Sequence, residues 1–230
     1  MHGCPVLMVD LDPQSNATSG MGFNKKEIKD GIYRVIIDGM PVRESIRHTA
    51  VERMDILPAN PDLIGAEVEL ASAESREMRL KNAIGAVKNA YDYIFIDSPP
   101  SLGLLTLNAL TCADSILIPI QCEYYAMEGL AQLMKTIHLL RQNLNKPLEL
   151  EGVVMTMFDS RVNLSSQIVG EVRKFFGKKA YETVIRRNIR LSEAPSYGKP
   201  VLLYDKSSTG AKEYMAFAKE FISRNTQKPR

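Results

Sequence analysis

Short apolar runs alternate along this chain with longer segments of helical periodicity, and this alternation constrains the fold more than any other feature of the sequence. The apolar runs are short, rich in β-branched residues and bounded by polar or turn residues; they lie at 6–9, 93–96, 115–120 and 152–157. The segments with helical spacing are 75–90, 123–144 and 163–176. Buried strands that alternate with amphipathic helices are typical of parallel sheets. The sequence therefore predicts an α/β fold, a mostly parallel sheet with helices on both faces.

Length and composition narrow the class of protein further. The chain has 230 residues, of which 45% are hydrophobic and 24% charged. These values predict one folded domain over residues 1–224, followed by a frayed tail at 225–230. The N-terminus has no basic flank and no apolar run of membrane-spanning length occurs, so we expect a cytoplasmic protein.

The net charge, the cysteines and the histidines do not by themselves indicate a function. The formal net charge is +2, which does not by itself indicate nucleic-acid binding but leaves room for a local basic patch. The three cysteines lack the paired short spacing of a zinc site, so we expect reduced thiols. The three histidines stand apart from one another and from cysteine, and we interpret them as incidental.

Aspartates follow the predicted strands at the point where each strand ends. In YDYIFIDSPPSLG, residues 91–103, Asp97 comes after an apolar run and precedes a sharp turn. This is the pattern of a Walker B strand, whose aspartate supports a magnesium ion bound to phosphates. The alternative is an aspartate that only caps the helix expected to begin near Ser101.

A second acidic motif precedes it in VDLDPQSNATSG, residues 9–20. Asp10 and Asp12 are two residues apart, so on an extended strand they point to the same side. Asn16, Thr18 and Ser19 follow in a predicted loop and offer short hydrogen-bonding side chains. Such a set suits the positioning of a water molecule and a phosphate-bound metal. A plain strand-to-turn junction can carry the same pattern, so both readings stay open on this motif alone.

Together with three further segments, these motifs resemble the ParA/Soj family of chromosome- and plasmid-partitioning ATPases, within the wider ParA/MinD group. The further segments are LPANPDLIGAEVEL (57–70), CEYYAMEGLAQL (122–133) and RRNIRLSEAPSYGKPVLLYD (186–205), and the Walker B match extends over 91–110. The resemblance covers essentially the whole chain, with the motifs in order. It implies a P-loop NTPase-like fold of the ParA type, ATP and Mg as cofactors, an ATP-dependent homodimer, non-specific DNA binding and a ParB-type centromere-binding partner, with no membrane binding.

The resemblance also implies roles for individual residues. Asp12 would position or activate the attacking water, while Asp10 and Asp97 would support the Mg, through water. The residues that correspond to the nucleotide-binding side are Met157, Phe158, Arg187 and Asn188. The residues that correspond to the DNA-binding surface are Arg186, Arg190, Lys212, Lys219 and Arg224, with Arg187 and Lys206 nearby. For this last set the alternative is an ordinary solvated charged face.

Three departures from the family pattern accompany the resemblance. In the family, a strand, a phosphate-binding P-loop of the form KGGxGKTT and a helix precede the VDLDPQ strand, whereas only residues 1–5 precede it here. We therefore expect that this sequence is a truncated version of a longer protein, in which the first strand and the P-loop are absent. The neighbouring strands would then have unpaired edges, and the chain would be inactive as written. In addition, Ser15 stands where glycine is usual and Arg186 where proline is common.

Two other functions remain open on the sequence. One is a non-catalytic module that binds DNA or a partner protein, which the absent P-loop favours. The other is a MinD-like membrane regulator, which would need a C-terminal amphipathic helix with an apolar face available to lipid. The apolar residues of segment 211–224, among them Phe217 and Phe221, are expected to dock on the sheet instead.

Overall fold

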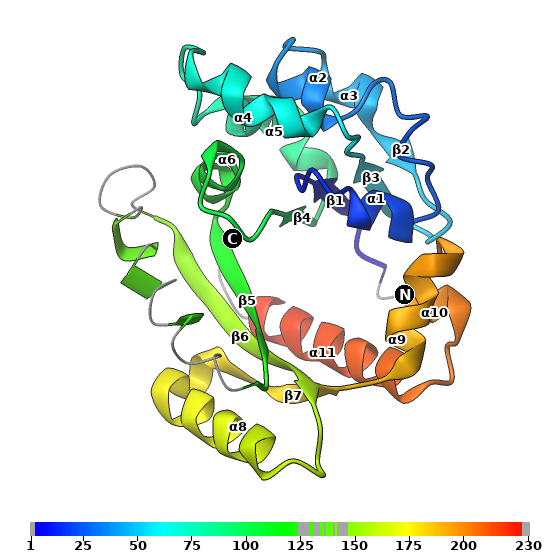
Figure 1. Ribbon diagram of the computed structural model, residues 1–230, viewed down its shortest axis with the longest axis vertical. Helices are drawn as coiled ribbons and strands as arrows, with labels where there is room; N and C mark the ends of the chain where they lie inside the picture. The colour runs from blue at the N-terminus through cyan, green and yellow to red at the C-terminus, as the bar shows by residue number, and fades with distance from the viewer. Residues whose placement is uncertain are drawn as a thin grey trace. The chain divides into compact units, whose positions relative to one another are not determined.

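The chain forms two compact units in the computed structural model (Figure 1). The structure describes residues 3–123, 129–130, 134–135, 137–139, 141 and 147–226. By their contacts, Met1–Ala113 and Pro195–Lys199 form the N-terminal unit, and Asp114–Ala194 and Pro200–Arg230 form the C-terminal unit. The expectation of a single domain over 1–224 stays a prediction beside this division.

The N-terminal unit is built around a sheet with strand order β2-β3-β1-β4. Its strands are β1 (Val6–Asp10), β2 (Arg47–His48), β3 (Met54–Leu57) and β4 (Tyr93–Asp97). Its helices are α1 (Asn16–Gly20), α2 (Ile32–Ile36), α3 (Val42–Ser45), α4 (Leu63–Ala71), α5 (Arg79–Gly85), η1 (Lys88–Ala90) and α6 (Leu104–Cys112). β1 pairs in parallel with both β3 and β4, and the short β2 is antiparallel to β3. Among the described residues β4 ends this sheet.

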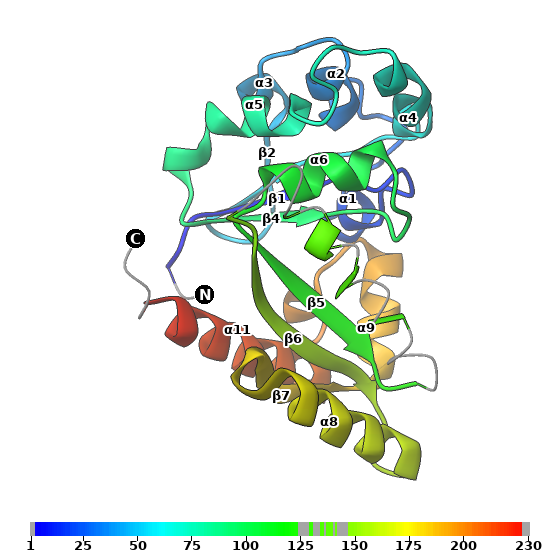
Figure 2. The same cartoon turned by 90° about the vertical axis from the view of Figure 1, so that its left-hand side faces the viewer.

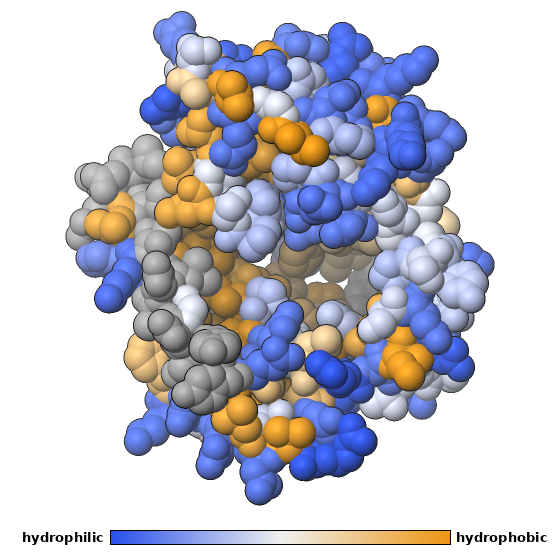
Figure 3. Space-filling view, viewed as in Figure 1, coloured by the Kyte–Doolittle hydropathy of each residue, from blue (hydrophilic) through white to orange (hydrophobic). Residues whose placement is uncertain are grey.

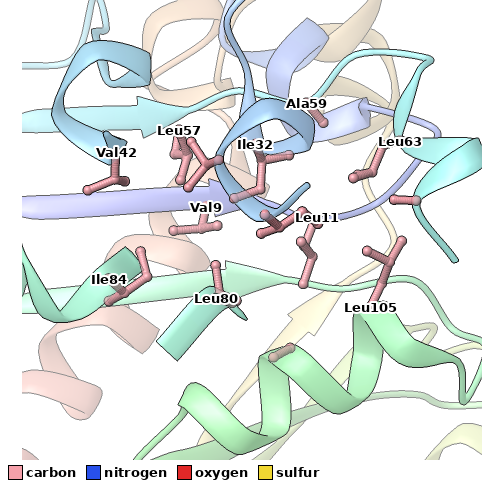
Figure 4. Close-up of a cluster of buried hydrophobic side chains, with 14 of the residues drawn as sticks. Val9, Leu11, Ile32, Val42, Leu57, Ala59, Leu63, Leu80, Ile84 and Leu105 are labelled. Carbon is pink, nitrogen blue, oxygen red and sulfur yellow. The ribbon is translucent and has the colours of Figure 1, made fainter. Parts of the chain in front are cut away.

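The core of this unit lies between one face of the sheet and the helices that cover it (Figure 4). Leu7 and Val9, which alternate along β1, are fully buried there. Ile32 of α2, Leu80 of α5 and Leu105 of α6 join them in the same cluster. Burying a side chain of this size contributes about 1.5–3 kcal/mol. This packing holds β1 and β4, and therefore the aspartates at their ends, in a rigid frame.

The C-terminal unit contains a parallel sheet with strand order β5-β6-β7 (Figure 2). Its strands are β5 (Ser115–Gln121), β6 (Glu149–Phe158) and β7 (Ala180–Arg186). Its helices are α8 (Asn163–Phe176), η2 (Gly177–Lys179), α9 (Ile189–Glu193), α10 (Val201–Tyr204) and α11 (Thr209–Thr226), and η3 (Ala194–Tyr197) links the two units along the chain. Among the described residues β5 ends this sheet on one side.

Successive residues of β6 point to opposite faces of this sheet, and a helix packs on each face. Val153 and Met155 share a core cluster with Val172 of α8. Val154 belongs to a different cluster, against which Phe217 and Phe221 of α11 pack. For this sheet, the prediction of helices on both faces is confirmed. The expectation that the apolar residues of 211–224 dock on the sheet is confirmed for Phe217 and Phe221, whereas Tyr214 is 41% exposed.

Several predicted elements differ from the observed ones in their bounds. The predicted strands and the predicted helix 163–176 are all present, whereas the predicted helix 75–90 is reduced to α5 and η1. Ser75 adopts φ +51°, a left-handed conformation that a continuous helix does not contain. Most of the predicted helix 123–144 lies outside the described residues.

The C-terminal tail also begins later than expected. α11 continues through Thr226. Near its end, the side-chain amide of Asn225 donates hydrogen bonds to Glu151 Oε1 at 2.9 Å and to the Phe221 carbonyl at 3.0 Å. The frayed tail predicted at 225–230 is therefore wrong for its first two residues, and 227–230 lie outside the described residues.

Apolar side chains are also exposed on the N-terminal unit. Ile64 and Val68 lie one turn apart on α4 and are 66% and 77% exposed, while Leu63 and Leu70 of the same helix are buried. Figure 3 shows hydrophobic surface in the region of α4. α4 thus carries apolar residues on its packed and on its exposed side. No helix within the described ranges is both long and apolar enough to cross a membrane.

Candidate functional site

β1 and β4 end side by side, and each ends in an aspartate. Asp10 is in register with Asp97, and the Leu11 N–H donates to the Asp97 carbonyl at 2.8 Å. Residues paired in this way on neighbouring parallel strands point to the same face of the sheet. The prediction that these aspartates stand where their strands end is confirmed.

Asp10 is fully buried and is held by Thr18 of α1. One carboxylate oxygen accepts hydrogen bonds from the Thr18 N–H and hydroxyl, both at 2.7 Å, and the other accepts from the Asp12 N–H at 3.2 Å. Burial raises the pKa of Asp10, and the hydrogen bonds from Thr18 oppose that rise. The Thr18 hydroxyl in turn accepts from the Ala59 N–H at 2.9 Å. One threonine therefore ties together β1, α1 and the loop after β3.

Asp12 has a different position from the one expected. β1 ends at Asp10 and Asp12 begins a turn, so the two aspartates do not lie on one extended strand that would point them to the same side. Its Oδ1 accepts from the Gln14 N–H at 2.9 Å and its carbonyl accepts from the Ser15 N–H at 2.8 Å. This tight turn leads directly into α1, which replaces the predicted loop. The half-buried carboxylate stabilises the turn and keeps Asp12 beside Asp10.

The same turn contains Ser15, which stands where the family pattern usually has glycine. Ser15 is buried and adopts φ +55° and ψ +39°, the left-handed conformation that favours glycine. Its carbonyl accepts from the N–H and the hydroxyl of Ser19, at 3.1 and 3.0 Å. Serine therefore adopts here the backbone conformation for which the usual glycine is suited.

Asp97 contrasts with Asp10 because no other described residue donates a hydrogen bond to its carboxylate or forms an ion pair with it. The side chain is exposed at the sheet edge, yet protein atoms withhold part of its hydration. That loss, followed by the negative charges of Asp10 and Asp12, raises the pKa of Asp97 to about 6. A cation at this edge would relieve the repulsion among the three carboxylates.

The helix-capping alternative for Asp97 is wrong. α6 begins at Leu104, seven positions later, and its N-cap residue is Gly103. Its Leu105 N–H donates instead to Glu67 Oε1 of α4, at 3.4 Å. The carboxylate of Asp97 is therefore not used by the helix that follows it.

The donor set fits magnesium only with help from other ligands. Within the described residues, no three His, Cys, Asp or Glu side chains converge in a self-contained metal site. Mg²⁺ commonly keeps several waters and binds one or two carboxylates together with substrate phosphates. Asp97, with Asp10 in register beside it, suits this way of binding Mg²⁺. When bound, the ion would neutralise phosphate charge.

The four predicted nucleotide-binding residues come together in the C-terminal unit, at the carboxyl ends of β6 and β7. Phe158 is in register with Arg186, and the Arg187 N–H donates to the Phe158 carbonyl at 3.0 Å. Met157 is 36% exposed and adopts φ +55°. Asn188 caps α9 by accepting from the Arg190 N–H at 2.9 Å. Their proximity supports a common site, and their roles stay predictions.

Arg186 stands where the family pattern commonly has proline, and it contacts the last helix. Its backbone N–H donates to Glu213 Oε2 at 2.8 Å, and its Nε donates to Glu213 Oε1 at 2.6 Å. Glu213 lies on α11, so this two-point contact joins β7 to the last helix. A proline at this position has no N–H to donate. Arginine therefore provides two hydrogen bonds where the usual residue would leave the glutamate with neither.

Two other arginines of the predicted DNA-binding surface also contact carboxylates. Arg190 lies 2.8 Å from Glu193 and 3.4 Å from Asp205. Arg224 is the most enclosed, because its guanidinium lies 2.6 Å from Glu220 and 4.0 Å from the centroid of the Tyr181 ring. It also donates to the carbonyls of Lys178 and Ala180, both at 2.9 Å.

Lys212 and Lys219, by contrast, are exposed on α11, and their ammonium groups have no ion-pair partner among the described residues. The five predicted DNA-binding residues thus differ in how far the fold already uses their charge.

The chain is similar to known proteins along nearly its whole length. Residues 1–150 match a family model described as an AAA domain. The chain is 55% identical over 218 residues to the sporulation initiation inhibitor protein Soj of Bacillus subtilis, covering 95% of this chain and 86% of that protein. It is 51% identical over 222 residues to the chromosome partitioning protein ParA of Myxococcus xanthus, covering 96% and 78%.

Two solved structures share the fold. The cobyrinic acid a,c-diamide synthase of Mycobacterium smegmatis with bound ADP and magnesium has a TM-score of 0.83 at 32% identity, covering 98% of this chain and 84% of that one. A putative plasmid partition protein of Borrelia burgdorferi bound to AMPPNP has a TM-score of 0.77 at 23% identity, covering 96% and 87%. The sequence identities, which extend over nearly the whole chain, show that it belongs to the ParA/Soj family of partitioning ATPases.

Proposed function

We propose that this protein is a ParA-type partitioning ATPase that binds DNA without sequence preference as an ATP-dependent homodimer and drives chromosome or plasmid segregation. A ParB-type centromere-binding protein would stimulate its hydrolysis, and it would act in the cytoplasm, on the nucleoid. The observation that carries the proposal is the pair of in-register aspartates, of which Asp10 is buried and held by Thr18, while Asp97 is exposed and has no counter-charge among the described residues.

In this proposal the acidic edge, formed by Asp10, Asp12 and Asp97, supports the metal ion and orients the attacking water. Asp97 supports Mg²⁺ through water, and Asp10 adds negative charge behind it while keeping α1 in place through Thr18. Asp12 orients the attacking water from a turn that its own backbone carbonyl closes. Phosphoryl transfer requires mainly positioning and charge neutralisation, which such an arrangement supplies.

The 230 residues contain no glycine-rich loop with the lysine and threonine of a P-loop. We propose that this polypeptide does not hydrolyse ATP unless a P-loop segment is added.

Calorimetric titration of Mg-ATP tests the proposal. The 230-residue chain is compared with a longer form that carries a P-loop segment before residue 1, and with that form bearing Asp97→Ala. We expect binding only in the longer form, and a weaker magnesium dependence in Asp97→Ala. Binding of Mg-ATP by the shorter chain would contradict the need for a P-loop. No binding by the longer form would contradict the ATPase function.

A non-catalytic module that binds DNA or a partner protein is the second candidate. The absence of a P-loop motif favours it for the polypeptide as written, and the exposed Lys212 and Lys219 support a nucleic-acid partner. Retention on DNA that does not change with ATP, even in the longer form, would support this candidate. Retention that requires ATP would support the ATPase. Retention should weaken steeply with salt in both cases, because phosphate contacts release counterions.

A membrane regulator has the least support. The two phenylalanine rings of α11 that a lipid surface would need, Phe217 and Phe221, already pack with Tyr181 in a core cluster. The Tyr181 and Phe217 ring centroids are 4.9 Å apart. Co-sedimentation with anionic lipid vesicles would reopen this function.

A further inference from the structure

Two glycines far apart in the sequence meet with no side chain between them. Gly22 has φ +90° and Gly198 has φ +60°, so both are left-handed. A Cβ on Gly22 would lie 2.9 Å from the Gly198 carbonyl oxygen, and a Cβ on Gly198 would lie 3.1 Å from the Gly22 Cα. Only glycine satisfies the backbone angle and the close approach together.

The segment that carries Gly198 departs from its sequence neighbours. Pro195–Lys199 belongs by its contacts to the N-terminal unit, whereas α9 before it and α10 after it belong to the C-terminal unit. A bond from the Gly198 N–H to the Pro195 carbonyl at 3.0 Å shapes this segment into a turn.

The turn contacts the end of α1, a helix that depends on outside support. α1 has five residues and no side-chain N-cap. Helices this short are not stable alone. The Thr18 bonds to Asp10 hold α1 on one side, and a Cβ on Gly198 would also lie 3.5 Å from the carbonyl of Ser19 in α1.

We propose that Pro195–Lys199 acts as a clasp on α1. The Gly22–Gly198 contact positions α1, and through it the bonds between Thr18 and Asp10. The inference rests on the proposed function, which assigns Asp10 to the Mg-ATP site.

Glycine variants of the 230-residue chain test the clasp, with amide hydrogen exchange and amide chemical shifts measured by NMR without nucleotide. Gly22→Ala disturbs both the backbone angle and the contact. Gly39→Ala is the matched control, because Gly39 has φ +73° and no atom within 4 Å of its Cβ position. Both variants carry similar backbone strain, and only the first disturbs the clasp.

Gly22→Ala should speed exchange of the Thr18 and Ser19 amides about tenfold, as expected when strain of this kind is added. It should also move the Thr18 amide resonance upfield, because its short bond to a carboxylate weakens. Gly39→Ala should leave both unchanged. Equal effects of the two variants on Thr18 would overturn the positioning role. If Gly22→Ala does not fold, Gly198→Ala, with its milder contact, should show a smaller change in the same direction.

No nucleotide or DNA is present, so these outcomes do not depend on whether Mg-ATP binding is found.

Discussion

The acidic edge of the N-terminal unit and the arginines of the C-terminal unit are both rich in charge, but they differ in how the charge is balanced. Asp97 has no cation or hydrogen-bond donor among the described residues. Arg186, Arg190 and Arg224 each lie within 2.8 Å of a carboxylate oxygen. The comparison teaches that a charged side chain predicted to bind a ligand is best judged by whether the fold already supplies its partner.

By that criterion the acidic edge is the stronger candidate for an incoming cation. An unpaired carboxylate beside two others is destabilising until a cation arrives. The paired arginines already have other tasks, and Arg224 is the clearest example, with two carbonyls, a carboxylate and an aromatic ring around it. On α11, Lys212 and Lys219 are the better candidates for phosphate contacts.

The largest expected effect tests the acidic edge through Asp12. In a form that carries a P-loop, Asp12→Ala should lower ATP turnover by about 100-fold or more, since a positioned acid or base contributes about that much. ATP-dependent dimers should persist, as measured by light scattering. Unchanged hydrolysis would remove Asp12 from the reaction and leave it only its role in the turn.

The next effect tests how Asp10 is held. Thr18→Ala removes the hydroxyl between Asp10 and the Ala59 amide and leaves buried polar groups without partners, so we expect a loss of about 2 kcal/mol in the free energy of unfolding. Urea denaturation measures this loss. Thr18→Ser keeps the hydroxyl and should lose markedly less. Equal losses in both variants would show that the methyl group, rather than the hydrogen bonds, stabilises the site.

A pair of variants on α11 separates structural cations from binding cations. Arg224→Ala should lower the free energy of unfolding by about 1–2 kcal/mol, because it removes a charge-assisted, partly buried network. Lys219→Ala should leave stability unchanged and, if DNA binds, lower the steepness of the salt dependence by about one unit in a logarithmic plot. The reverse outcome would contradict the distinction drawn between these two residues.

The pH dependence of stability tests whether the Asp97 carboxylate lacks a compensating positive charge, as it does among the described residues. Its pKa in the folded protein is raised from 3.8 to about 6, so the protonated form is favoured by folding and stability falls as pH rises through that range. Asp97→Asn should therefore be more stable than the parent at about pH 8, by roughly 1 kcal/mol after allowance for screening of an exposed group.

The difference between Asp97→Asn and its parent should shrink toward acid pH, where Asp97 is protonated in both folded and unfolded chains. Thermal unfolding in EDTA over this pH range measures it. A constant difference at all pH values would show that the amide acts through contacts rather than through charge.

The smallest expected effect concerns Ser15. A non-glycine residue in the left-handed conformation is strained, so Ser15→Gly should stabilise the turn by up to about 1 kcal/mol, reduced by the greater freedom of glycine in the unfolded chain. Thermal unfolding measures this change. A decrease in stability would mean that the buried serine side chain contributes more through its contacts than the backbone angle costs.

The sequence predicted β1, β4, β5 and β6, because apolar runs bounded by aspartate or turn residues have few other uses, but it missed β2, β3 and β7. It also placed Asp10 and Asp97 correctly at the ends of their strands. Helix boundaries were predicted less well. The segment 75–90 has apolar residues at helical spacing, but the left-handed Ser75 and the tertiary packing leave only α5 and η1.

The candidate site was predicted only in part for a similar reason. Nothing in the spacing of the sequence indicates that Thr18 bonds to Asp10, or that Ala59 donates to the same hydroxyl. The motif 57–70 was recognised, but not its contact with α1. Likewise, α4 has apolar residues on two sides, so its pattern does not reveal which side packs.

The sequence by itself determined the α/β class, the family and the residue types at the strand ends, because these depend on local patterning and on motifs in a fixed order. The tertiary structure alone decided which charges remain unpaired, which glycines touch and which arginines belong to the fold. These properties depend on residues that are distant in the chain, such as Gly22 and Gly198, and their contacts form only when the strands and helices pack.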